Sequence, residues 1–200
     1  KDQLRHNTDE LIARGGFCSP TIFINGADMY VGNDRLPLVE YRLRQLLAHA
    51  GGVQREVPGA MWSSMRGPDE AGLVAALRQA VPVDRPGVRW HYSNLGYAVL
   101  GLVVAAVTGR GVREAIDEDL VAPLGLTGTT WEAPAAAALG YRRDPYRDAV
   151  CIEPVMDQGA VGAGGQLWST AADLLVWGDA LAGGAPQVLP ASVVEAMHTL

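Results

Sequence analysis

An uninterrupted apolar run constrains this chain more than any other feature of its sequence. The run covers the thirteen residues 95–107 and lies between Ser93, a residue type that caps helix N-termini, and Gly109, a residue type that ends helices. It is too short to cross a bilayer, which takes about 20 residues. A helix that is apolar on nearly all sides must be covered by other elements. The sequence therefore predicts a helix over 94–108 that is buried in a packed domain.

The composition limits the partners of the chain. Hydrophobic residues make up 48% and charged residues 19%, which is typical of a folded protein and not of a disordered one. The net charge of -6 gives no electrostatic reason to bind nucleic acid or anionic lipid. We therefore expect no nucleic-acid partner and no transmembrane segment. Because no charged segment followed by an apolar stretch precedes the first helix, we see no export signal; the compartment stays open, with the cytoplasm slightly favoured.

Three residue types limit the chemistry. The two cysteines, Cys18 and Cys151, are too few and too isolated for a disulfide framework or a cysteine-rich zinc site, and the four histidines are scattered. We expect no metal and no cofactor in the main part of the chain. Lys1 is the only lysine, so a mechanism that needs a buried lysine base has no candidate in this sequence.

The pattern of expected elements changes near residue 40. Before it we expect a helix over 7–14, a hairpin over 21–32 with its turn at Asn25-Gly26, and a helix over 34–50. After it helices alternate with glycine-rich loops. The expected elements there are a surface loop over 51–68, helices from 70 to about 80 and over 94–108, 112–120, 171–181 and 191–199, a short strand over 127–131, and a mostly irregular stretch over 133–165. We predict a helix-dominated α+β chain with two parts, 1–40 and 41–200.

The tripeptide Tyr92-Ser93-Asn94 lies at the junction between a loop and the apolar helix. A tyrosine in this place can present its phenol to a cleft, and an amide two residues later can orient a substrate carbonyl. The alternative is that Ser93 caps the helix while Tyr92 packs into the core. From spacing alone, both interpretations remain open.

Four stretches occur in the order known from one hydrolase superfamily. They are LLAHAGGV at 46–53, PGVRWHYSNLGY at 86–97 followed by LG, VAPLGL at 121–126, and GGQLWST at 164–170 followed by Asp173-Leu174. They resemble the LLSHTSGL, PG-x-x-x-x-YSN-x-GY-x-x-LG, I-x-x-PLGM and GGL-x-ST-x-x-DL segments of class C-like serine hydrolases of the β-lactamase and penicillin-binding-protein superfamily. The resemblance covers residues 41–200.

The resemblance implies a fold and a chemistry. The fold pairs a helical domain with an antiparallel sheet flanked by helices, and the chain resembles mainly the helical domain. The activity is hydrolysis of an ester, an amide, a β-lactam or a peptide through an acyl-enzyme. Tyr92 takes the position of a catalytic acid/base partner, and Asn94 that of a residue that helps hold the substrate and the family's lysine.

The chain also departs from the family pattern. The nucleophile is the serine of an S-x-x-K motif, and no such motif occurs here, because the only lysine is Lys1. The sequence SSMR at 63–66 is no substitute, since arginine stays protonated. We expect the third motif, a KTG or HxG strand, beyond residue 200. By this reasoning the isolated chain is inactive. Ala48, Ala50 and Gly51 also replace residues of the SHTSG signature.

Residues 1–40 resemble a different family. NTDE at 7–10, ARG at 13–15, SPT at 19–21 and GNDRL at 32–36 are similar to the C-terminal part of 2-hydroxychromene-2-carboxylate isomerases and kappa glutathione transferases, which have a thioredoxin fold. The resemblance implies a thioredoxin-like hairpin and helix. It also implies a glutathione site at Ser19, Pro20, Asn33 and Asp34. The alternative is a plain strand entry at Ser19-Pro20 and a helix cap at Asp34.

Cys18 beside this proline is either a reactive thiol or a small buried apolar side chain. For the whole chain three functions stay open. They are a serine hydrolase acting on a small ester, amide or peptide, a glutathione-dependent fragment, and a non-catalytic protein that associates through exposed apolar surface. The change near residue 40 is either a genuine fusion or a joined or truncated sequence.

Overall fold

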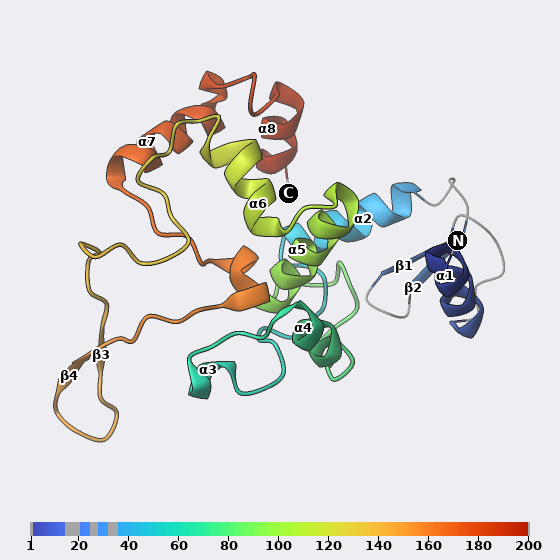
Figure 1. The fold of residues 1–200 in the computed structure, drawn as a ribbon, viewed down its shortest axis with the longest axis horizontal. Coiled ribbons are helices and arrows are strands. Elements are labelled where there is room, and N and C mark those ends of the chain that lie inside the picture. Colours follow the sequence, from blue (N-terminus) through green and yellow to red (C-terminus); the bar gives the residue numbers. More distant parts are fainter. Residues whose placement is uncertain (1, 15–20, 25–27, 32–35, 200) are drawn as a thin grey trace.

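The computed structural model describes residues 2–14, 21–24, 28–31 and 36–199 (Figure 1). In chain order the elements are α1 (Asp2–Ala13), β1 (Thr21–Ile24), β2 (Asp28–Val31), α2 (Leu36–Leu47), α3 (Met61–Ser64), α4 (Glu70–Leu77), α5 (Asn94–Thr108), α6 (Val112–Ile116), η2 (Asp117–Val121), β3 (Tyr141–Arg143), β4 (Val150–Ile152), η3 (Gly159–Gly164), α7 (Ala171–Asp179), η4 (Ala180–Gly184) and α8 (Ala191–His198). The prediction of a helix-dominated α+β chain is confirmed.

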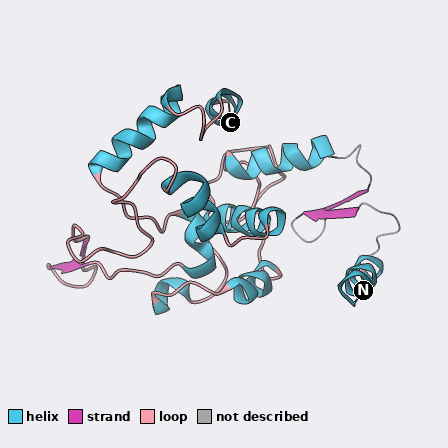
Figure 2. Ribbon diagram, turned by 45° about the horizontal axis from the view of Figure 1, so that its top comes forward, coloured by secondary structure: helices cyan, strands magenta, loops and turns pink. Residues whose placement is uncertain are grey.

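The N-terminal elements lie to one side of the helical body (Figures 1 and 2). β1 and β2 form an antiparallel hairpin in which Thr21 faces Val31 and Ile24 faces Asp28, so the predicted hairpin is confirmed. α1 begins earlier than expected, at Asp2. A two-stranded hairpin is common to many folds, and the thioredoxin-like resemblance therefore stays a prediction. Cys18, Ser19, Pro20, Asn33 and Asp34 lie outside the described residues.

α5 is the central helix, as the apolar run predicts. Leu95 is 1% exposed and Ala98 is fully buried, and the helix packs against α2, α6 and η3 and shares a buried cluster with Leu73 of α4. The Ser93 hydroxyl accepts a hydrogen bond from the Gly96 N–H at 2.9 Å, and Gly109 ends the helix with φ 70°. Burying a leucine side chain contributes roughly 1.5–3 kcal/mol. Both the extent of this helix and its caps are confirmed.

The stretch 51–68 differs from the expected surface loop, because its middle is part of the core. Val57 and Met61 are buried, and they pack in one cluster with Leu73, Leu95 and Val161. Val57 comes from an irregular segment and Met61 from α3, which is only four residues long, so these inward side chains follow no helical or strand period. Periodicity therefore could not find them.

Two further expectations need correction. The strand expected over 127–131 is a single bridge between Thr130 and Trp168. The helix expected over 112–120 is α-helical only to Ile116 and continues as one wide π-turn through Val121. A second apolar cluster lies under α7 and α8, where Ala180, Ala185 and Leu189 are buried.

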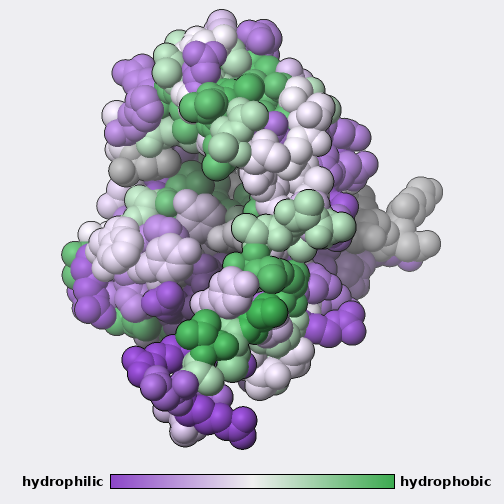
Figure 3. All heavy atoms as spheres, turned by 90° about the vertical axis from the view of Figure 1, so that its left-hand side faces the viewer, coloured by the Kyte–Doolittle hydropathy of each residue, from purple (hydrophilic) through white to green (hydrophobic). Residues whose placement is uncertain are grey.

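Residues 133–158 leave the body as an extended arm that carries the β3–β4 hairpin (Figure 1). Much of this stretch is irregular, as expected, but the hairpin was not predicted. On the face shown in Figure 3, hydrophobic patches alternate with hydrophilic ones. Tyr146 at the tip of the hairpin is 93% exposed.

The C-terminal base of the arm is attached by a close crossing of two backbone segments. The Gly67 N–H donates to the Asp157 carbonyl at 2.6 Å, and the Ala160 N–H donates to the Pro68 carbonyl at 2.8 Å. A Cβ at Gly67 would collide with the carbonyl oxygen of Gln158, and a Cβ at Gly159 with that of Pro68. Gly159 also has φ 52°, in the left-handed region that favours glycine. The two segments can approach this closely only because both positions lack a side chain.

Candidate functional site

Tyr92 lies immediately before α5 and remains accessible. The residue is 37% exposed, and among the described residues its hydroxyl has no hydrogen-bond partner. The ring packs against His49, with centroids 4.4 Å apart, and against Trp90 at 6.4 Å. The structure therefore does not support the alternative that Tyr92 is buried in the core. A fixed ring with an unpaired hydroxyl can exchange a proton with a bound group.

His49 joins two loops beside Tyr92. Its Nδ1 accepts a hydrogen bond from the Ser93 N–H at 3.1 Å, and its carbonyl accepts one from the His91 N–H at 2.7 Å. Burial lowers the pKa of His49, which favours the neutral ring that this acceptor role requires. Its φ of 55° is uncommon for a residue with a side chain. Sequence reasoning did not single out His49.

Tyr97 also contacts the ring of His49, at 5.0 Å, but its hydroxyl is occupied. It donates to the Leu47 carbonyl at 3.0 Å. The pKa of Tyr97 is raised, first by burial and then by the charge of a Tyr92 phenolate. Of the two tyrosines beside His49, Tyr92 is thus the one whose hydroxyl is free to meet a ligand.

Asn94 is held at the first position of α5 by Glu56. The Asn94 side-chain nitrogen Nδ2 lies 3.1 Å from both carboxylate oxygens of Glu56. The Asn94 backbone N–H donates to the Arg55 carbonyl at 2.8 Å. A Cβ built on Gly164 would lie 3.7 Å from the Asn94 oxygen Oδ1, so that oxygen faces the backbone of η3. The structure therefore places Tyr92 and Asn94 at one end of α5, beside two loops from other parts of the chain.

Arg55 brings a positive charge to the same place. Its guanidinium carbon lies 5.4 Å from the centroid of the Tyr92 ring, and its Nε is 3.0 Å from Glu56. Sequence reasoning missed both Arg55 and Glu56. They stand 37 and 36 residues before Tyr92 in the sequence, in a stretch with no usable period, so no local signal identifies them.

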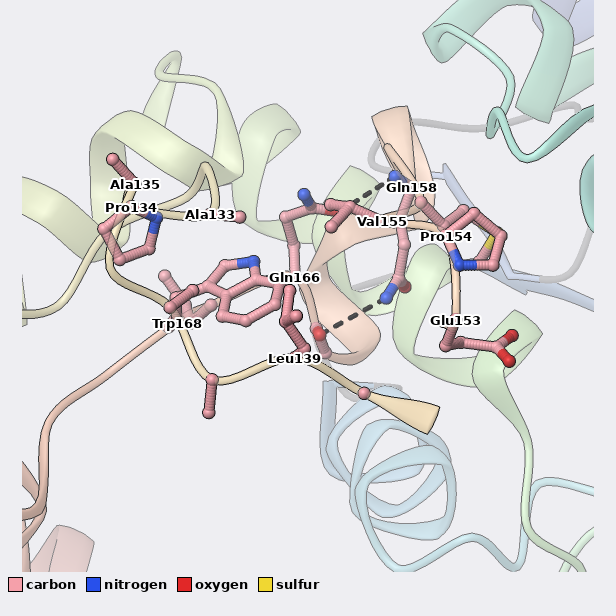
Figure 4. A pocket seen from close by; sticks show the side chains of 16 residues that line it. Ala133, Pro134, Ala135, Leu139, Glu153, Pro154, Val155, Gln158, Gln166 and Trp168 are labelled. Carbon is pink, nitrogen blue, oxygen red and sulfur yellow. Dashed lines mark hydrogen bonds between the residues drawn. The ribbon is translucent and has the colours of Figure 1, made fainter. Parts of the chain in front are cut away.

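Two hollows lie between the arm and the body. The one in Figure 4 has a volume of about 450 Å³ and an apolar lining that includes Leu139, Val155 and Trp168. Its two glutamines are tied to the protein, since the Gln158 N–H donates to Gln166 at 2.8 Å and the Gln158 side chain donates to the Gly165 carbonyl at 3.3 Å. The other hollow, of about 440 Å³, lies beside Arg113 and Trp131. Neither Tyr92 nor Asn94 lines either hollow.

The described part of the chain holds no group of three or more histidine, cysteine or acidic side chains arranged to bind a metal ion. Cys151 on β4 is a half-buried free thiol. Within the described residues no single helix is long and apolar enough to span a membrane. α5 and the α6–η2 segment have that length and composition only together, as a pair bent by 79°.

Comparison with known proteins points to one family. The sequence profile of the family described as Beta-lactamase matches residues 39–199. The chain is 33% identical over 154 residues to "Putative beta-lactamase-like 1" of Homo sapiens, covering 74% of this chain and 29% of that protein. It is 30% identical over 134 residues to "Putative D-alanyl-D-alanine carboxypeptidase" of Escherichia coli O157:H7, covering 62% and 27%. The chain thus spans less than a third of these curated relatives.

Solved structures give the same result for the fold. The D-stereospecific amidohydrolase of a Streptomyces species superposes with a TM-score of 0.64 at 28% identity, covering 76% of this chain and 49% of that one. A class C beta-lactamase superposes with a TM-score of 0.59 at 23% identity, covering 78% and 41%. At that lower identity the second match shows the fold alone.

Proposed function

Because the chain belongs to the Beta-lactamase family, we propose that residues 39–199 carry the tyrosine side of a serine-hydrolase site that cleaves amides, esters or β-lactams through an acyl-enzyme. Tyr92 is the proton-transfer residue in this proposal, and Asn94 holds the substrate. One observation carries the proposal. The Tyr92 phenol is exposed and free of hydrogen bonds, while its ring is fixed by His49 and Arg55.

Each of these residues has a distinct task in the proposed reaction. Acyl transfer needs a proton to leave the attacking hydroxyl and a proton to reach the leaving group. The free Tyr92 hydroxyl is suited to relay a proton from the attacking hydroxyl to the leaving group. Arg55 places positive charge over the ring on which negative charge develops during that transfer. The neutral ring of His49 holds the loop that leads into α5.

The attacking serine belongs to polypeptide outside this sequence. No S-x-x-K motif occurs among these residues, and Lys1 is the only lysine. The proposal therefore assigns acylation to the complete protein and not to the 200-residue chain. The names of the relatives include a carboxypeptidase, an amidohydrolase and a beta-lactamase, which supports an amide-type substrate.

The test is hydrolysis of nitrocefin and p-nitrophenyl acetate by the full-length protein encoded by the gene. Changing Tyr92 to Phe removes only the hydroxyl, and we expect kcat to fall about 10²- to 10⁴-fold, the usual size of a proton-transfer contribution. Tyr146→Phe, at the exposed tip of the arm, is the matched control and should leave kcat unchanged. An unchanged kcat in Tyr92→Phe, or no serine adduct with a fluorophosphonate, would overturn the proposal.

We propose separately that the chain has two parts that meet near residue 40 and that the first binds glutathione through Ser19, Pro20, Asn33 and Asp34. The start of the family match at residue 39 and the β1–β2 hairpin support this division. Sequencing genomic DNA across the junction tests the fusion. Calorimetric titration with glutathione, repeated with Asp34→Ala, tests the site. If hydrolysis and glutathione binding both fail, the third function, non-catalytic association, is left.

A further inference from the structure

One carboxylate connects the two candidate catalytic residues. Glu56 accepts from the Asn94 side chain at 3.1 Å through both of its oxygens, and it pairs with Arg55 at 3.0 Å. Arg55 in turn lies over the ring of Tyr92. The Glu56 side chain is half-buried, whereas that of Arg55 is largely exposed. A charge-assisted hydrogen bond is shorter and stronger than a neutral one. Exposure to water reduces this extra strength.

The loop that carries Glu56 is held in place without the Glu56 side chain. The Ser93 hydroxyl donates to the Gln54 carbonyl at 2.7 Å, and the Arg55 carbonyl accepts from the N–H groups of Asn94 and Leu95 at 2.8 and 3.1 Å. The Val81 N–H donates to the Gln54 side chain at 2.7 Å. These bonds join residues 54–56 to the start of α5 through backbone and neighbouring groups. The Glu56 carboxylate is therefore free for a task other than holding the loop.

The chemistry of Glu56 also fixes which way the Asn94 amide points. An ionised carboxylate only accepts hydrogen bonds, so the atom facing it must be the donor Nδ2. The acceptor Oδ1 then lies on the opposite side, toward Gly164. Glu56 thus sets the orientation of the whole Asn94 amide group.

We propose that Glu56 is a positioning residue of the hydrolase site, which orients the Asn94 amide and anchors Arg55 over Tyr92. The inference rests on the proposed function, because Asn94 and Tyr92 act on substrate only if the complete protein is a hydrolase. The orientation itself can be measured in this chain without any activity.

The first measurement uses the 200-residue chain. In Glu56→Gln the side chain keeps its shape but loses its charge and gains donors of its own, so we expect the Asn94 side-chain NH₂ signals to shift in the ¹H–¹⁵N spectrum and to become mobile by heteronuclear NOE. Backbone signals of α5 should stay in place, because the loop is held independently. Glu132→Gln is the matched control, since Glu132 pairs with Arg113 and does not touch Asn94. Unchanged Asn94 side-chain signals would overturn the inference.

The second measurement uses hydrolysis of nitrocefin by the full-length protein. We expect Glu56→Gln to lower kcat/KM about tenfold, the size of one hydrogen bond to a charged group. In an Asn94→Ala background the same change should have only the small effect that passes through Arg55, because neighbouring residues of one network are not additive. An unchanged kcat/KM in Glu56→Gln, or an undiminished loss in the Asn94→Ala background, would contradict a positioning role.

The two measurements separate the two claims. If Tyr92→Phe is inactive and Glu56→Gln behaves as wild type in both assays, the hydrolase proposal stands and the positioning role is wrong. If Tyr92→Phe is fully active, the hydrolase proposal falls, and the Asn94 signals alone decide whether Glu56 orients that amide.

Discussion

The start of α5 and the β3–β4 arm are built from similar residue types and differ in what surrounds them. Around the start of α5, Tyr92 contacts both His49 and Arg55, and Leu95 beside it is buried. On the arm, Tyr146 and Arg143 face solvent, and the ion pair of Arg143 with Asp148 is almost fully exposed. An isolated two-stranded hairpin is marginal in water. Aromatic rings and charges thus gain a fixed geometry from the apolar core beneath them.

The largest expected difference is in the free energy of unfolding. Leu95→Ala opens a cavity in the core and should cost about 2–5 kcal/mol. Ile152→Ala on the arm removes a side chain that is mostly in water and should cost less than about 0.5 kcal/mol. Urea unfolding of both variants, followed by circular dichroism, measures the two values. Similar losses would mean that the arm is packed in solution against something else.

A second difference concerns buried and exposed carboxylates. Asp173 is 8% exposed and accepts hydrogen bonds from the Gly128 N–H and the Thr129 hydroxyl, both at 2.8 Å. Asp173→Ala leaves the Gly128 N–H without this partner, while the Thr129 hydroxyl keeps the Ser169 hydroxyl at 2.9 Å, and we expect a loss of about 1–3 kcal/mol. Asp148→Ala, which breaks the exposed pair with Arg143, should cost less than about 0.5 kcal/mol. Equal falls in the melting temperatures of the two variants would contradict the expectation that the buried carboxylate contributes more to stability.

The smallest expected effect is a pH dependence from His49. Its pKa in the folded chain lies below the ordinary value of 6.5, so the unfolded chain binds the proton more tightly. The stabilisation by neutral His49 is therefore fully present above about pH 6.5 and is lost as the pH falls through the lower folded value. The melting temperature, measured between pH 5 and 7.5, should change less with pH in His49→Gln than in wild type. An identical pH dependence would show that other groups cause it.

The sequence predicted the parts of the fold that depend on near neighbours. Ser93 and Gly109 marked both ends of α5, and Asp69 caps α4 by accepting from the Gly72 N–H at 2.8 Å. The position of Tyr92 at the helix start followed from the same cap. These signals are readable because a cap and its partner lie within three or four residues.

The sequence did not predict the contacts that turn this place into a site. Glu56 meets Asn94 across 38 residues, and His49 meets Ser93 across 44. Val57 enters the core from an irregular segment, and Met61 enters it from the four-residue helix α3. Such contacts depend on how loops fold back over a helix, and hydrophobic periodicity carries no information about that.

The crossing of Gly67 and Gly159 has a consequence for how this protein can diversify. Neither glycine can take a side chain, so the place where the arm returns to the body is fixed by backbone geometry alone. Insertions, deletions or wholesale exchange of the tip, from about residue 144 to 149, leave that attachment untouched. Recognition of new partners can therefore be acquired at the tip while the scaffold around α5 is inherited unchanged.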